Sequence, residues 1–127
     1  MNFKISELIH SDTANRLKIN NMPDINSLDC MLDLICDCLQ PIRDKIKKPM
    51  IITSGYRCPA LNRAVGGVSN SQHLKGQAVD FHINGMSIKD TIDFVINSGV
   101  PFDQIIDERS WVHISYKKGN NRRQIIR

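Results

Sequence analysis

Two short segments of alternating apolar and polar residues constrain the fold most, because each carries a side chain that can bind a metal. The segments are Ala78–Ile83 and Trp111–Tyr116. Strict alternation is typical of a half-buried strand, in which successive side chains point to opposite faces. The apolar residues would face the core, so Asp80 and His113 would face away from it. If the two strands are neighbours in one sheet, both side chains lie on the same open face.

A third metal-binding side chain, His73, follows a stretch rich in turn-forming residues at 66–72. Glycine and asparagine there permit backbone angles that let the chain fold a loop over the sheet. Two neutral imidazoles and one carboxylate suit a borderline cation such as Zn²⁺, and three protein ligands leave a fourth position open for water. The pattern therefore predicts a catalytic zinc site whose ligands are His73, Asp80 and His113.

The pattern of the whole chain predicts an α+β fold built on one small antiparallel sheet. The expected strands lie at about residues 50–54, 78–83, 104–107 and 111–116. Helices would pack on one face of this sheet. A chain of 127 residues with 41% hydrophobic residues can bury one core, so we expect a single catalytic domain over residues 1–127.

Helical periodicity is clearest between residues 28 and 46, where apolar residues recur every three or four positions. Ser27 is the expected N-cap of this helix. Pro41 should kink the helix or split it in two, because proline lacks an N–H donor. A second helix would begin after Ser87, whose Ser-x-x-Asp pattern resembles a capping box, and would end near Gly99.

Seven short stretches carry a resemblance to a known family. They are Ile52–Arg57, Leu61–Asn62, Gly66–Gly67, Ser71–His73, Gly76–Asp80, Asp103–Ile106 and Trp111–Ser115. In sequence, order and spacing they resemble the zinc D-alanyl-D-alanine carboxypeptidase family. That family includes the peptidoglycan peptidase domains of phage endolysins, VanX-type dipeptidases and, more distantly, the hedgehog signalling fold. The N-terminal residues 3–23 also resemble the single-domain members.

This resemblance implies a zinc metallopeptidase that hydrolyses an amide bond in the peptide stem of bacterial peptidoglycan, as a D,D-carboxypeptidase or an endolysin-like endopeptidase. It also implies an acidic general base just before the Trp-x-His strand, and we predict Glu108 for that role. A carboxylate beside a zinc-bound water of pKa roughly 7 can take its proton and pass it to the leaving amine. Many members have the base three residues before the second histidine, where this chain has Ser110, so the adjacent Asp107 stays an alternative.

Four further side chains receive candidate roles from the resemblance. Arg57 would lie near the metal, where it could hold a carboxylate or stabilise an oxyanion, or it would only brace the loop that carries His73. Ser71 and Gln72 would contact the substrate or orient His73, or make ordinary loop hydrogen bonds. Trp111 would flank the substrate groove or simply pack on its strand.

His82 lies two residues after Asp80 and therefore on the same face of the strand. A fourth protein ligand would close the metal site, so we expect His82 to line the groove or to be an exposed structural residue. No neighbouring residue gives His10 a role.

The four cysteines are Cys30, Cys36, Cys38 and Cys58. Their spacing matches no familiar zinc motif. Since the chain shows no secretory signal, we expect free thiols that pack as small hydrophobic residues.

The net charge is +4, and part of the excess lies in a basic C-terminal tail: Lys117, Lys118, Arg122, Arg123 and Arg127. Without interleaved aromatic residues, such a run is typical of a solvated terminus, so no specific nucleic-acid partner is expected. Attraction to an anionic cell envelope would be modest because salt screens it.

No apolar run approaches the roughly 20 residues of a membrane span, and the N-terminus lacks the apolar region of a signal peptide. We therefore expect a monomer that is made in the cytoplasm, has no membrane partner, and meets the wall after export or lysis or in a virion. The alternative from another class is a non-catalytic protein that keeps the metal fold for binding or assembly. The unusual spacing of Glu108 motivates that alternative.

Overall fold

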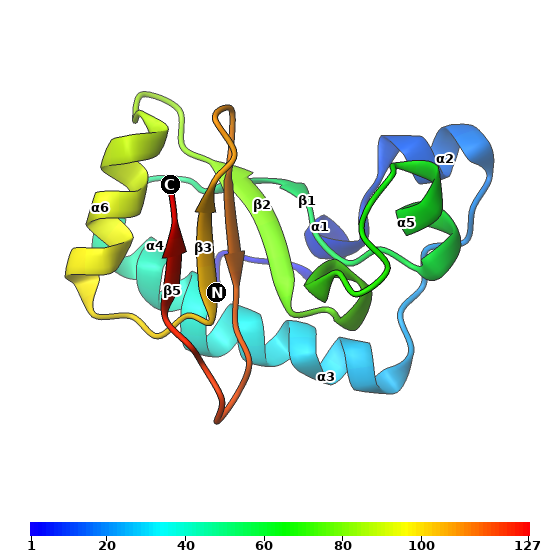
Figure 1. The fold of residues 1–127 in the computed structure, drawn as a ribbon, viewed down its shortest axis with the longest axis horizontal. Helices are drawn as coiled ribbons and strands as arrows, with labels where there is room; N and C mark the ends of the chain where they lie inside the picture. The colour runs from blue at the N-terminus through cyan, green and yellow to red at the C-terminus, as the bar shows by residue number, and fades with distance from the viewer.

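The computed structural model describes residues 1–127, and a five-stranded sheet lies at its centre (Figure 1). The strands are β1 (Ile51–Ser54), β2 (Ala78–His82), β3 (Gln104–Asp107), β4 (Val112–Ser115) and β5 (Gln124–Ile126). Their order is β1-β2-β4-β3-β5. The α+β class and the positions of the first four strands agree with the prediction. The sheet is mixed rather than purely antiparallel, because the unpredicted β5 pairs parallel to β3.

One face of the sheet is covered by a long helical run and by one further helix. The run consists of α3 (Ile25–Leu34), the π-helical turn η1 (Ile35–Leu39) and α4 (Gln40–Ile46), and the further helix is α6 (Ile88–Ser98). The short helices α1 (Ile5–Ile9), α2 (Asp12–Leu17) and α5 (Pro59–Ala64) gather near β1 (Figure 1). None of the helices combines the length and apolar character needed to span a membrane.

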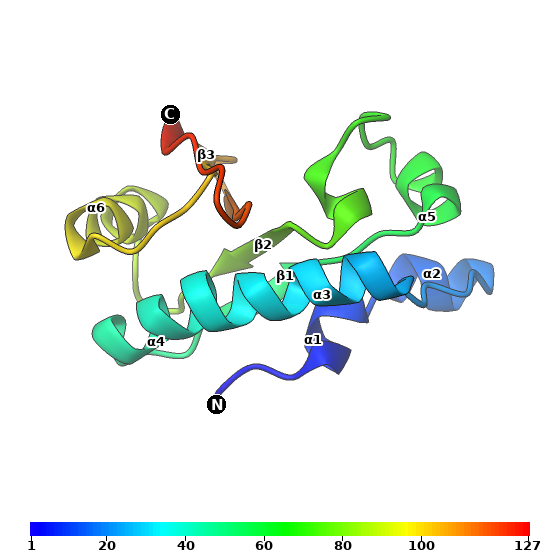
Figure 2. The same ribbon diagram turned by 90° about the horizontal axis from the view of Figure 1, so that it is seen from below.

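Two details of the long helix differ from the prediction. Its N-cap is Asp24, whose carboxylate accepts a hydrogen bond from the backbone N–H of Ser27, so the helix begins earlier and Ser27 is buried in its first turn. Pro41 does not break the helix, which stays continuous in Figure 2. The wider π-helical turn before Pro41 makes room for the proline ring and changes the hydrogen-bond pattern where the proline has no N–H to donate.

Both ends of α6 lie where the sequence predicts them. The Ser87 hydroxyl accepts a hydrogen bond from the backbone N–H of Asp90 at the N-terminus. Gly99 ends the helix in the left-handed conformation, with φ of 76°. Its apolar face packs into the core, where Ile92 and Val95 are fully buried.

The strand register separates a core face from an open face. Val79, Ile114 and Ile105 lie opposite one another across β2, β4 and β3, and all three are buried beneath the helices. The adjacent row, one residue along each strand, contains Asp80 and His113. Because side chains alternate along a strand, this second row points to the face opposite the long helix, as predicted.

The basic C-terminal tail is exposed, as predicted, but two of its arginines also contact the segment before β3. Arg122 forms an ion pair with the buried Asp103 at 2.8 Å. The Arg123 guanidinium lies 4.6 Å from the centre of the Phe102 ring. The aromatic and acidic partners are supplied by the segment before β3, which is why composition within the tail did not indicate them. These contacts hold β5 against the sheet.

The cysteines are all free thiols, as expected. Cys38 and Cys58 are buried, and burial raises the pKa of the Cys38 thiol. Cys36 is exposed, however, so the prediction that these residues pack as small hydrophobic groups is wrong at that position. Residue 36 lies on the outer side of the π-helical turn, where no core is within reach.

Substitution of Gly76 tests the contact between the long helix and the 3₁₀ turn η2 (Gln72–Lys75). Gly76 has φ of 72°, and a Cβ there would lie 2.3 Å from the Ser27 carbonyl oxygen. We expect Gly76→Ala to lower the free energy of unfolding by about 3 kcal/mol, from backbone strain and overpacking. Gly85 has φ of 83° but open space around it, so Gly85→Ala should cost about 1 kcal/mol. Urea unfolding measures both, and equal losses would contradict the packing argument.

Candidate metal centre

Three side chains from different elements converge on the open face of the sheet. His73 comes from η2, Asp80 from β2 and His113 from β4. Asp80 Oδ1 lies 3.3 Å from His73 Nε2 and 3.1 Å from His113 Nδ1. One potential ligand atom from each residue lies within 4.8 Å of the others. The three predicted ligands therefore form a group that could hold a metal ion.

The strand pairing explains two of these positions, and a hydrogen-bonded turn explains the third. Asp80 and His113 are direct partners in the β2–β4 register. The Ser71 hydroxyl caps η2 by accepting a hydrogen bond from the His73 backbone N–H at 3.2 Å. The His73 carbonyl accepts from the backbone N–H of Arg57 at 3.0 Å, which ties η2 to the chain after β1.

The His73 ring is oriented so that Nε2 faces the centre of the group. Its Nδ1 lies 2.7 Å from the carbonyl oxygen of Gly55. A carbonyl can only accept, so Nδ1 carries a proton and donates it to this bond. In the neutral ring Nε2 then presents a lone pair to Asp80 at 3.3 Å. A lone pair facing a carboxylate oxygen needs a proton or a cation beside it, and a metal ion meets that need.

The Asp80 carboxyl is ionised over the physiological range of pH. Its burial opposes ionisation, but hydrogen bonds and positive charge from the imidazolium forms of His113 and His73 outweigh that effect and lower the pKa of Asp80 to about 2. Only 13% of its side chain is exposed. A buried carboxylate beside two imidazoles is a donor set that suits Zn²⁺, and three such donors leave a coordination position for water or substrate. The residues therefore fit the predicted ion.

The depressed pKa of Asp80 gives a pH dependence for the metal-free protein. Its folded value of about 2 lies below the unfolded value of 3.8, so the carboxylate stabilises the fold above pH 4. That contribution, about 2 kcal/mol, is lost as the pH falls from 5 to 2. We expect the stability difference between wild type and Asp80→Asn to shrink over this range in urea unfolding with chelator present. A constant difference would show that Asp80 is not held as an ion.

The candidate metal-binding group lies in an open cleft of about 630 Å³. The eight residues to which the sequence analysis gave a first-choice role in the site line this cleft: Arg57, Ser71, Gln72, His73, Asp80, Glu108, Trp111 and His113. His82 does not line it; that half-buried residue pairs with Ile51 at the far end of β2. His10 lies outside it as well and pairs with Asp12 on the surface.

Glu108 and Asp107 lie differently with respect to the cleft. Glu108 is exposed and begins the turn between β3 and β4, where its backbone N–H donates to the carbonyl of Trp111 at 3.1 Å. Asp107 is the last residue of β3, and its carboxylate accepts from the backbone N–H of Arg109 at 2.8 Å. Glu108 lines the cleft and Asp107 does not. This geometry favours Glu108 as the carboxylate that can reach a bound substrate.

Arg57 brings a positive charge to the cleft. Its Nη2 lies 3.4 Å from the Ser71 hydroxyl, and its Nε is buried without a hydrogen-bond partner. Burial lowers the pKa of this guanidinium, while the negative charge of Asp80 opposes the shift. A buried N–H without a partner is costly, and the contacts seen in the structure leave this cost at Arg57 unrelieved.

The two remaining candidates, Gln72 and Trp111, differ in how free their side chains are to contact a substrate. The Gln72 amide nitrogen donates to the Asp103 carboxylate at 3.0 Å, so this side chain is held by protein groups and is not free for substrate in this arrangement. Trp111 is 39% exposed at the rim of the cleft. Sequence reasoning missed Gln104, Ile106 and Arg122, which also line the cleft. Alternation in 104–107 could have placed the first two on the open face, but nothing in the sequence indicated Arg122.

Comparison with known protein families gives a match over most of the chain. A family model described as Peptidase M15 matches residues 1–115. This range contains the three candidate metal ligands, Arg57 and Glu108, and it ends before the tail that supplies Arg122. No curated protein matches the chain.

Proposed function

The chain belongs to the Peptidase M15 family of zinc D-Ala-D-Ala carboxypeptidases and endolysin-type peptidases, and we propose that it hydrolyses an amide bond in the peptide stem of bacterial peptidoglycan. The observation that carries this proposal is the convergence of His73, Asp80 and His113 in a cleft that also contains Glu108. Family membership implies a metallopeptidase acting on a peptide. The metal, which we propose is Zn²⁺, and the peptidoglycan substrate are our own inferences.

His73, Asp80 and His113 would hold the ion. A zinc ion there would polarise the scissile carbonyl and lower the pKa of water, so that the water loses a proton more readily and attacks the carbonyl carbon. Glu108 would take a proton from the attacking water and deliver it to the leaving amine. Arg57, which lines the cleft, would present its guanidinium to the oxygen that becomes negative, or to a substrate carboxylate. The hydrogen bond from His73 to Gly55 would keep the ligand ring in place throughout.

The character of the cleft supports an extended polar substrate. It is open, and only three of its fifteen lining residues are hydrophobic. The cations Arg57 and Arg122 lie along it, which suits a peptide that carries free carboxylates, as peptidoglycan stems do. D,D-carboxypeptidase and endopeptidase action both fit such a cleft, and the protein would meet its substrate in the cell wall after export or lysis, or as part of a virion.

Mass spectrometry of digested peptidoglycan tests the proposal and identifies the bond. Purified sacculi are incubated with the zinc-loaded protein, and the released or remaining muropeptides are compared with a sample treated with chelator. We expect fragments that differ from the parent by one hydrolysed amide, at the D-Ala-D-Ala, L-Ala-D-Glu or cross-bridge position. Loss of wall material without any cleaved amide would contradict peptidase action.

A further inference from the structure

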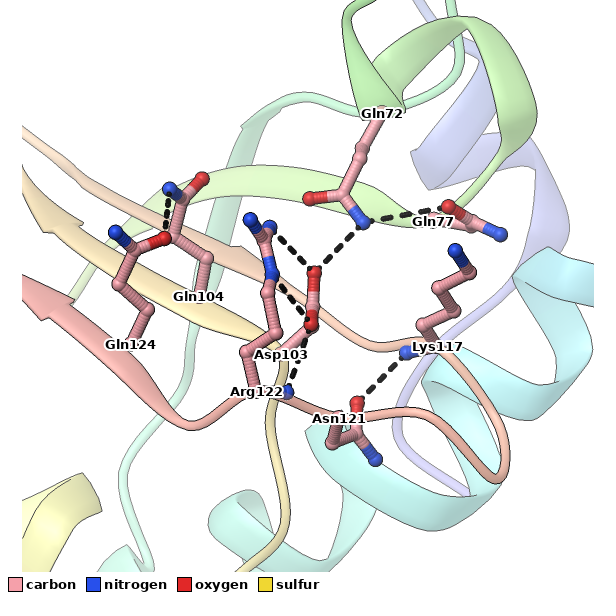
Figure 3. A network of polar contacts seen from close by, with 8 residues as sticks. All are labelled: Gln72, Gln77, Asp103, Gln104, Lys117, Asn121, Arg122 and Gln124. Atoms are coloured by element: carbon pink, nitrogen blue, oxygen red, sulfur yellow. Dashed lines mark hydrogen bonds and ion pairs between the residues drawn. The ribbon is translucent and has the colours of Figure 1, made fainter.

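A second hollow, of about 260 Å³, adjoins the catalytic cleft. Gln72 and Arg122 line both, so the two spaces meet at these side chains. None of the residues around the second hollow is hydrophobic, and three are cations: Lys75, Lys117 and Arg122. We name these three residues the basic subsite. Figure 3 shows the polar network from which it is built.

The single carboxylate in this hollow, Asp103, is fully occupied by protein donors. Its Oδ1 accepts from Arg122 N at 2.9 Å and from Arg122 Nε at 3.0 Å. Its Oδ2 accepts from Arg122 Nη2 at 2.8 Å and from Gln72 Nε2 at 3.0 Å (Figure 3). The Asp103 side chain is only 2% exposed. It therefore neutralises and positions Arg122, whose Nη1 takes no part in these bonds.

The two lysines of the basic subsite have no carboxylate partner. Their side chains are exposed, and neither ammonium group forms an ion pair. In Figure 3 the Lys117 side chain extends toward Gln77. The next residue, Lys118, points elsewhere and pairs with Asp33 at 3.6 Å. Two unpaired ammonium groups facing one polar hollow favour an anion between them.

We propose that the basic subsite binds a free carboxylate of the stem peptide, separate from the amide that is cleaved, and so selects substrates that carry this carboxylate. The inference rests on the proposed function and deepens it. Gln72 directly precedes the metal-binding His73, so a carboxylate held in the subsite anchors the peptide beside the reacting centre. Lys117 and Arg122 lie beyond residues 1–115 that match the family model, whereas Lys75 lies within them, so the C-terminal segment supplies two of the three residues of the subsite.

Two synthetic stem peptides that differ in one group test the subsite. The first carries the free carboxylates, and in the second the carboxylate remote from the scissile bond is a carboxamide. We expect wild type to prefer the first by about two- to thirtyfold in kcat/KM, because two exposed charge pairs each contribute about 1.4- to 5-fold. Lys75→Gln combined with Lys117→Gln should remove the preference, whereas the matched control Lys118→Gln should keep it. Arg122 is left intact because its loss would strand the buried Asp103.

Binding of both peptides, measured by calorimetry on the same proteins, separates this inference from the proposed function. If wild type binds the carboxylate peptide with the lower Kd and the double variant loses this preference, the subsite is supported. This holds even if neither peptide is cleaved, because the lack of cleavage would contradict only the proposed function. Cleavage of both peptides at equal rates, or a preference that survives in the double variant, would overturn the subsite while the peptidase stands. Absence of both binding and cleavage would overturn both.

Discussion

Replacing His113 with alanine is expected to lower the affinity for zinc by more than about 100-fold and to remove hydrolysis with it. Loss of a residue that only orients a ligand costs roughly 10–100-fold, and His113 is itself one of three ligands. Its Nδ1 lies 3.1 Å from Asp80 Oδ1, so the change also removes a hydrogen bond that holds the second ligand. Equilibrium dialysis followed by metal analysis gives the affinity, and amine release from peptidoglycan gives the activity.

His82→Ala is the matched control for this variant. His82 lies on the same face of β2 as Asp80, but it is outside the cleft. Its removal should leave zinc affinity and turnover within about twofold of wild type, since surface changes away from special contacts have small effects. If His113→Ala still bound zinc tightly, or if His82→Ala no longer bound zinc, the ion would not be held by His73, Asp80 and His113.

Glu108→Gln is expected to lower kcat by about 10²- to 10⁴-fold while zinc affinity stays unchanged, because proton transfer by a positioned side chain contributes this much. Glutamine keeps the size of the side chain but cannot accept the proton of the attacking water. Glu108 is exposed and makes no side-chain bond to the metal-binding residues, so the fold and the ligands should not change. Steady-state rates on one stem peptide, with zinc content measured on the same samples, check this.

Asp107→Asn distinguishes the two carboxylates that the sequence left as alternatives. Asparagine can still accept the hydrogen bond from the Arg109 backbone that Asp107 accepts at 2.8 Å, so the turn is preserved. Activity close to that of wild type is expected, because Asp107 does not line the cleft. A large loss in Asp107→Asn together with an active Glu108→Gln would reverse the assignment of the base.

The sequence was sufficient for the parts of the fold that depend on local alternation. Side chains alternate between the two faces of a strand, so Asp80 and His113 must face away from the core once their neighbours are buried. The β2–β4 register confirms this, because it pairs the two residues directly. The N-cap and the end of α6 were likewise predictable, since Ser87 and Gly99 each carry a local signal. His73 was predicted on weaker grounds, because the turn-forming residues before it allow a loop over the sheet but do not determine where that loop lies.

Features that depend on distant partners could not be predicted in this way. Arg122 is 19 residues from Asp103, and no periodic pattern links them, so both β5 and the basic subsite were missed. The tail was interpreted from its own composition, whereas its structure is determined by Phe102 and Asp103 in the preceding segment. Cys36 shows the same limit on a smaller scale, since a π-helical turn shifts which side chains face the core.

The most direct measurement is the release of new amino groups from purified peptidoglycan by the wild-type protein, with chelator and with zinc added back. We expect release by the zinc-loaded protein, its loss on chelation and its recovery when zinc is restored. A protein that binds zinc through His73, Asp80 and His113 but releases no amines from any type of wall would contradict hydrolysis. That result would indicate that this fold keeps its metal site for binding or assembly.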